Sequence, residues 1–112
     1  MRNDVLVDKM LGYTVKIIRY CENCDYESFS ADIMLAEACV FNLSQLGELC
    51  RRADVSFVSE HPEIPWHQLY GLRNRIVHDY DGVNLKLVWE IITEDLPELR
   101  DTLKEIEFPP GT

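Results

Sequence analysis

The sequence predicts an all-α protein, an antiparallel bundle of four to five helices, and three observations lead to this prediction. Apolar residues recur at spacings of three and four over most of the chain, as they do on one face of a helix. No segment alternates apolar and polar residues in the manner of a half-buried strand. Breakers such as Pro62, Pro65 and Gly82 separate the periodic segments. Helices with one apolar stripe bury it by packing into such a bundle.

The first two predicted helices occupy the N-terminal half. One runs from about Asp4 to Tyr20, with apolar residues such as Val15 and Ile18 at helical spacing. The second runs from Ile33 to Arg52 without a breaker, and its many apolar residues predict a long, mostly buried helix. The stretch before it offers three candidate N-cap residues, Asp25, Ser28 and Ser30.

Two more helices are predicted in the C-terminal half. Pro65 suits the first turn of a third helix, which passes through Trp66 and Val77 and ends at Asp81-Gly82. Asn84 is a candidate cap for a fourth helix from Leu85 to Ile106. Pro97 lacks an N–H and clashes with the carbonyl four residues earlier. We therefore expect it to kink this helix, or to split it near Thr93, which could cap a new start.

A chain of 112 residues is expected to form one domain, which we place at residues 1–107, with a loose tail at residues 108–112. Hydrophobic residues at 46% and charged residues at 28% are typical of a globular protein and argue against disorder. We expect no segment with the apolar length needed to cross a bilayer, and acidic residues near the N-terminus interrupt any signal-peptide pattern. The sequence therefore predicts a cytoplasmic protein without a membrane partner.

The formal net charge of −9 opposes binding to nucleic acid, because contacts with phosphate supply much of that affinity. The charge is uneven, however, since the acidic residues crowd the last third of the chain. Four arginines lie in the middle, at Arg51, Arg52, Arg73 and Arg75. The distribution allows a local basic cleft on an acidic body, and equally an acidic face that docks a basic partner.

Four cysteines are present without a secretory signal, so a disulfide framework is not expected. Cys39 and Cys50 lie among apolar residues and are predicted to be buried packing residues. Cys21 and Cys24 form a Cys-x-x-Cys pair, which is half of a zinc site or a redox pair, but no second pair completes it. We predict no metal site and no cofactor.

The segment from Arg73 to Tyr80 reads Arg-Asn-Arg-Ile-Val-His-Asp-Tyr and supplies a fixed cation, a group that titrates near neutral pH and a modifiable hydroxyl. On a regular helix Asn74 and His78 share a face, where the carboxamide could orient the imidazole. Arg73 and His78 are five apart, about 140° around a helix, so one straight helix does not aim both at one phosphate. Either the helix ends near His78, or a two-fold dimer brings two copies together.

The Arg73-x-x-x-x-His78-x-Tyr80 pattern resembles the signature of the HEPN superfamily, and more narrowly the HepT-like ribonuclease toxins that are paired with a minimal nucleotidyltransferase. The resemblance extends over roughly the last two thirds of the chain, through Pro62-Glu63-Ile64-Pro65-Trp66, Gly71-Leu72-Arg73-Asn74 and Val88-Trp89-Glu90-Ile91. It implies a helical bundle that forms a homodimer. Because Arg73 and His78 point apart on one helix, we expect the third helices of the two copies to meet in this dimer. The resemblance also implies catalytic Arg73 and His78, RNA as substrate, and AMPylation of Tyr80 by the nucleotidyltransferase antitoxin.

The residue types suit cleavage of RNA without a metal ion. His78 would take a proton from the ribose 2′-OH or return one to the leaving 5′-oxygen, while Arg73 stabilises charge on the phosphoryl oxygens. Use of the 2′-OH as the nucleophile restricts the substrate to RNA, excludes DNA and leaves a 2′,3′-cyclic phosphate. Asn74 would support this pair. AMP on Tyr80 would add negative charge beside it and compete with the substrate phosphate.

Two other interpretations remain open from the sequence. Arg73 could be a surface cation paired with Asp79 or a glutamate of the fourth helix, with His78 favoured at a helix C-terminus and Tyr80 at the edge of the core. Alternatively, the bundle could be a non-catalytic, nucleotide-binding or regulatory subunit of the nucleotidyltransferase, which the net charge of −9 favours slightly.

Overall fold

The computed structural model describes residues 1–78 and 82–110, apart from the side chain of His78. It confirms the all-α prediction, because its only sheet in these residues is one pair of two-residue strands. The elements in chain order are α1 (Asn3–Tyr20), α2 (Tyr26–Ala31), α3 (Ile33–Cys50), α4 (Val55–Glu60), α5 (Trp66–Tyr70), α6 (Leu72–Ile76), β1 (Val77–His78), β2 (Gly82–Val83), α7 (Leu85–Glu90), the π-helical η1 (Ile91–Asp95) and α8 (Leu96–Lys104).

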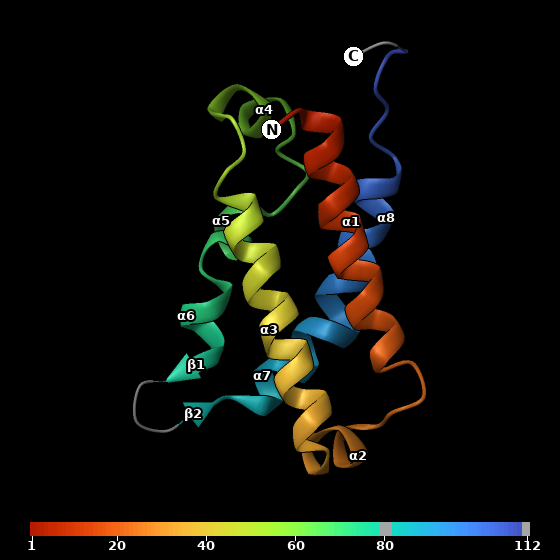
Figure 1. Ribbon diagram of the computed structural model, residues 1–112, viewed down its shortest axis with the longest axis vertical. Coiled ribbons are helices and arrows are strands. Elements are labelled where there is room, and N and C mark those ends of the chain that lie inside the picture. Colours follow the sequence, from red (N-terminus) through yellow and green to blue (C-terminus); the bar gives the residue numbers. More distant parts are fainter. Residues whose placement is uncertain (79–81, 111–112) are drawn as a thin grey trace.

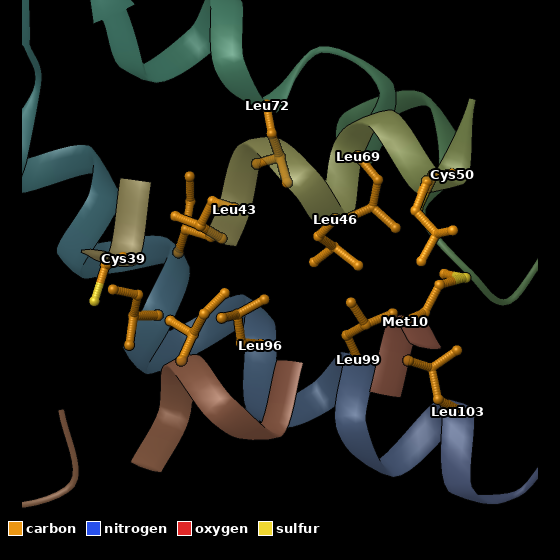
Figure 2. Packing of buried hydrophobic residues seen from close by; sticks show 14 of the residues in the cluster. Met10, Cys39, Leu43, Leu46, Cys50, Leu69, Leu72, Leu96, Leu99 and Leu103 are labelled. Carbon is orange, nitrogen blue, oxygen red and sulfur yellow. The ribbon is translucent and has the colours of Figure 1, made fainter. Parts of the chain in front are cut away.

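Helix α3 occupies the centre of the molecule. Helices α1 and α8 pack together on one side of it, and α5, α6 and the β1–β2 hairpin lie on the other (Figure 1). Figure 2 shows leucines of α5 and α6 above α3 and leucines of α8 below it, with Leu43 and Leu46 of α3 between them. Both of these α3 leucines are fully buried. Because α3 is buried from two sides, it joins α1 and α8 to α5, α6 and the hairpin.

Two short helices, α2 and α4, were not predicted. Asp25 caps α2, since its side chain accepts from the Ser28 N–H and the Ser28 hydroxyl accepts from the Asp25 N–H. The next helix, α3, is capped by Asp32, which was not among the candidates, through a hydrogen bond from the Leu35 N–H. The two caps, Asp25 and Asp32, are seven residues apart, so the short helix α2 fits into a stretch that we expected to be a connection.

Helix α4 is held by one buried aromatic residue. Phe57 is 2% exposed, and its ring packs edge-on against Trp66 and stacks with Phe108 at a centroid distance of 6.3 Å. Trp66 is also buried, and its indole N–H donates to the His61 carbonyl. The first residue of the segment that we assign to the tail, Phe108, therefore contacts the bundle.

The third predicted helix is broken and shorter than expected. Gly71 separates α5 from α6, and α6 ends at Ile76 instead of continuing to Asp81-Gly82. Val77 already has extended backbone angles, and Val77 and His78 pair antiparallel with Val83 and Gly82. A β-branched Ile-Val pair favours extended backbone at this point. The helical bundle thus carries a small hairpin at the end of α6.

The interruption expected from Pro97 takes the form of a π-helical turn, η1, immediately before α8. A wider turn accommodates the missing N–H and the ring of Pro97 without ending the helix. Thr93 does not cap a new helix, because its hydroxyl donates to the Trp89 carbonyl four residues earlier. The partners change here as well, since α7 packs on α2 and α3 whereas α8 packs on α1.

One expectation about membranes was wrong. Helix α3 has 18 residues with a mean hydropathy of 1.2, so its length and composition alone would suffice for a membrane span. In the bundle 44% of these residues are buried, and the helix packs against α1, α5 and α6. A central helix that is covered on several sides needs this composition.

Helices α3 and α5 approach each other closely at Gly47. A Cβ atom placed on Gly47 would lie 2.7 Å from the backbone carbonyl oxygen of Leu69 in α5. The oxygen belongs to the main chain, so it cannot rotate away as a side chain would. Gly47 therefore sets the distance between α3 and α5.

We predict that Gly47→Ala destabilises the protein by about 1–3 kcal/mol, the usual cost of overpacking. Gly12→Ala is the matched control, because Gly12 is exposed in α1 and nothing lies within 4 Å of its added Cβ. The control should gain roughly 0.5–1 kcal/mol from the better helix propensity of alanine. Urea unfolding monitored by circular dichroism measures both changes. Equal stability of the two variants would contradict the close approach.

Candidate active site

Helix α6 is fixed to the bundle by its two ends. Leu72 is 1% exposed and Ile76 is fully buried, four residues apart on the face that packs against α3 and α7. The residues between them are turned outward, so Arg73 and Asn74 are exposed. The short helix therefore holds its polar residues at the surface with a buried leucine and isoleucine as anchors.

The end of α6 leads directly into the hairpin that contains His78. The Val77 N–H donates to the Arg73 carbonyl and closes the helix, and the Asn84 N–H donates to the Ile76 carbonyl across the hairpin. In the register of β1 and β2, His78 is opposite Gly82. Gly82 has a φ of +77°, in the left-handed region that glycine adopts more easily than other residues. The backbone of His78 is thus tied to α6 on one side and to the start of α7 on the other.

Arg73 borders a groove of about 740 Å³ between α3 and the hairpin. The α3 side of this groove exposes large apolar side chains, with Ile33 at 71% and Phe41 at 61%. Val77 and Val83 of the hairpin form the opposite wall. We call this surface the α3 groove; its lining residues include Ile33, Ala36, Glu37, Val40, Phe41, Ser44, Gln45, Glu48, Arg73, Val77, Val83 and Leu85.

The Arg73 guanidinium forms no ion pair with any residue in the described ranges 1–78 and 82–110. The interpretation that a glutamate of the fourth helix pairs with Arg73 is therefore not realised there. Asp79, the other partner considered, lies outside the described residues. The exposed cation at the rim of an apolar groove is available to an incoming anion.

Asn74 lies on a different surface from Arg73. It borders a second hollow, together with Arg51 at the C-terminal end of α3 and Arg75 of α6. The expectation that Asn74 and His78 share one helical face was wrong, because α6 ends at Ile76 and His78 belongs to a strand. The supporting role of Asn74 remains a prediction.

The remaining predicted site residues are only partly covered by the structure. For His78 the backbone is described but the side chain is not, and Tyr80 lies outside the described residues altogether. The angular conflict between Arg73 and His78 on one straight helix does not arise, because the helix ends between them. This agrees with the first of the two solutions considered from the sequence.

The four cysteines are free thiols, and none belongs to a group of three or more metal-ligating side chains within the described residues. Cys21 lies against Cys39 of α3, with 3.6 Å between the two sulfur atoms. Hydrogen bonding to Cys21 and burial raise the pKa of Cys39, and burial raises the pKa of Cys50 to about 12. Both thiols stay protonated near neutral pH, which fits the predicted packing role.

The α3 groove was missed from the sequence because α3 was expected to be mostly buried. Ile33, Phe41 and Glu48 are spaced eight and seven apart, which places them along one helical face. The two carboxylates on this face, Glu37 and Glu48, were the available signal, since charged residues rarely lie on a fully buried stripe.

A model of one protein family, described as ribonuclease HepT-like, matches residues 10–106. The chain belongs to the HepT-like ribonuclease family. Its relatives include "Putative RNase TTE0752" of Caldanaerobacter subterraneus subsp. tengcongensis, which is 33% identical over 84% of this chain and 90% of its own length. "Putative RNase MJ1380" of Methanocaldococcus jannaschii is 33% identical over 82% of each chain.

A third relative in the HepT-like family is "Probable ribonuclease HepT" of Thermococcus cleftensis, 30% identical over 72% of this chain and 74% of its own length. No solved structure matches the chain significantly. The resemblance to HepT-like ribonucleases inferred from Arg73, His78 and Tyr80 is thereby confirmed at the level of the family.

Proposed function

We propose that this HepT-like ribonuclease is the toxin of a toxin–antitoxin pair and cleaves RNA in the cytoplasm without a metal ion or other cofactor. The observation that carries the proposal is the exposed Arg73, which lacks an ion-pair partner among the described residues and lies one turn before the strand that holds His78. A fixed cation near a histidine provides electrostatic stabilisation and proton transfer, the two requirements of phosphodiester cleavage.

In the proposed reaction the ribose 2′-oxygen attacks the adjacent phosphorus as His78 accepts its proton. A P–O bond forms to the 2′-oxygen, and the bond to the 5′-oxygen of the next nucleotide breaks. That oxygen takes the proton back from the His78 imidazolium and leaves as a 5′-hydroxyl, while the other fragment ends in a 2′,3′-cyclic phosphate. Arg73 neutralises the charge that accumulates on the non-bridging oxygens. DNA lacks the 2′-hydroxyl and is not a substrate.

We predict that His78→Ala and Arg73→Ala each lower RNA cleavage by about 10²- to 10⁴-fold, the contribution expected of a general acid or base and of a charge-stabilising group. The measurement is cleavage of total RNA by purified protein in EDTA, with mapping of the product ends. Arg19→Ala, which removes an exposed arginine of α1, is the control.

Cleavage by His78→Ala at the parental rate would refute the catalytic assignment. Absence of cleavage by the parent itself would instead favour the alternative of a regulatory subunit.

The active form is proposed to be a homodimer that covers the α3 groove. Soluble monomers rarely expose contiguous apolar surfaces of this kind, and Ile33 and Phe41 are both more than half exposed. In a two-fold interface the same surface serves both copies, so the apolar residues of each α3 groove would cover those of the other. This arrangement would also bring the two α6 helices, with their Arg73 residues, to one cleft.

We predict that Phe41→Glu makes the protein a monomer, since it places a charge in the middle of the apolar face. Sedimentation at micromolar concentration should give about twice the 13.1 kDa chain mass for the parent and the chain mass for the variant. Val55→Glu is the matched control, because Val55 is 83% exposed at the start of α4 and is not part of the groove. A parent that sediments as a monomer and still cuts RNA would eliminate the dimer.

Neutralisation is proposed to occur through AMPylation of Tyr80 by a cognate minimal nucleotidyltransferase. The support lies in the sequence, where Tyr80 is two residues beyond His78 and between the two strands of the hairpin. A nucleotide attached there would bring negative charge towards Arg73 and compete with the phosphate of RNA. The fold need not change for activity to be lost.

We predict that co-expression with such a nucleotidyltransferase adds one or more AMP groups at Tyr80 and suppresses RNA cleavage, and that Tyr80→Phe escapes the modification. Intact-mass spectrometry with peptide mapping measures this. The competing acceptors are Tyr13, Tyr20, Tyr26 and Tyr70. AMP found on any of them, or an unmodified mass, would remove Tyr80 from the regulatory role.

A further inference from the structure

The second hollow, on the side of α6 away from the α3 groove, has a volume of about 850 Å³. Three separate elements border it: the C-terminal end of α3 with Arg51, α5 with His67 and Tyr70, and α6 with Arg75. No aspartate or glutamate is among its described lining residues. We call this surface the basic hollow.

The charge of the hollow contrasts with that of the chain. The protein has 20 acidic and 11 basic residues, yet this hollow gathers two arginines and a histidine without a carboxylate. Neither Arg51 nor Arg75 forms an ion pair with a residue in the described part of the chain. A position at a helix C-terminus favours Arg51 by itself, but it does not explain why His67 of α5 and Arg75 of α6 border the same space.

Tyr70 adds an aromatic surface to these cations. The residue is half-buried, and its ring packs against that of Trp66 with 6.5 Å between the centroids. Trp66 is buried and hydrogen-bonded to the His61 carbonyl, so it holds the tyrosine ring in place. A ring that is fixed from one side and borders an open hollow is a suitable platform for stacking a nucleic-acid base.

The hollow also lies beside the proposed catalytic group. Arg75 borders the hollow, whereas Arg73, two residues earlier on the same five-residue helix, borders the α3 groove. A polyanion that crosses α6 would therefore meet cations on both sides of it. Single-stranded RNA fits better than a duplex, because stacking on Tyr70 requires a base that is free of its partner.

We propose that the basic hollow binds single-stranded RNA next to the cleaved bond, with Arg51 and Arg75 on phosphates and Tyr70 stacked on a base. The proposal rests on the ribonuclease function proposed above. It adds that the enzyme selects RNA in single-stranded form. Phosphate contacts through the arginines are independent of sequence, so the hollow supplies affinity and direction of the strand and not base specificity.

The test is binding of a fluorescent single-stranded oligonucleotide of about twelve nucleotides, 2′-O-methylated throughout so that a 2′-OH mechanism cannot cleave it. Arg51→Ala/Arg75→Ala should weaken binding at least tenfold. A plot of the logarithm of the binding constant against the logarithm of the salt concentration should also become less steep, by about 1.4. Each phosphate contact on a single strand contributes roughly 0.7 to this slope, and the variant removes two contacts. Tyr70→Ala should weaken binding as well, whereas Tyr70→Phe should not.

The matched control is Arg19→Ala/Lys104→Ala, which removes the same charge from two exposed positions on α1 and α8. The proposal would be overturned if Arg51→Ala/Arg75→Ala bound the oligonucleotide as tightly as the parent does. It would also be overturned if the control variant weakened binding by the same factor. An equal loss of binding to a duplex of the same length would overturn it as well. Because the oligonucleotide is not cleaved, a parent that binds through the hollow but cuts no RNA would disprove the ribonuclease mechanism and leave the binding site standing.

Discussion

The structure depends on the close approach of α5 to α3 at Gly47. With no side chain at this position, the Leu69 carbonyl comes within reach of α3, and Leu69 and Leu72 pack onto Leu43 and Leu46 (Figure 2). Helix α6 follows α5 after a single glycine, so its place is determined by the same contact. The positions of Arg73 and of the hairpin therefore derive from a packing distance that is set one helix away.

Helix α3 serves three different purposes around its circumference. One face joins the leucines of α5 and α6, a second contacts α1, and a third is left open with Ile33 and Phe41 exposed. A mostly apolar sequence fulfils all three, which explains its mean hydropathy, and the polar residues Glu37, Ser44, Gln45 and Glu48 border the open face. Seven of the 20 acidic residues of the chain lie between Glu90 and Glu107, in η1, α8 and their surroundings.

Most of the helices could be predicted from the sequence because periodicity and caps act locally. Helix α1 and the apolar run of α3 were found in this way, and Asn84 caps α7 as expected through its hydrogen bond from the Leu87 N–H. The end of α6 could not be found, because a hairpin of two-residue strands depends on pairing between Val77 and Val83. The β-branched Ile76-Val77 pair was the local sign of extended backbone, but the helical spacing of apolar residues outweighed it in the prediction.

In the candidate site, too, some features could be predicted from local sequence and others depend on tertiary packing. Arg73 could be named from its spacing to His78, but its opening onto an apolar groove follows from the orientation of α6, which only tertiary packing determines. The sequence also grouped Arg73 with Asn74, although the two border different surfaces. Neighbouring residues on a helix point about 100° apart, so a motif that is continuous in sequence divides between two faces.

The π-helical turn at Ile91–Asp95 allows α7 and α8, on either side of it, to pack against different helices. In a regular α-helix each residue advances the direction of the side chains by about 100°, and a π turn advances less per residue. The extra residue therefore resets the phase between Val88, which is buried near α2 and α3, and Leu96, Leu99 and Leu103, which are buried near α1. The length of this segment, more than the identity of any of its side chains, determines whether both halves of one helix find their partners.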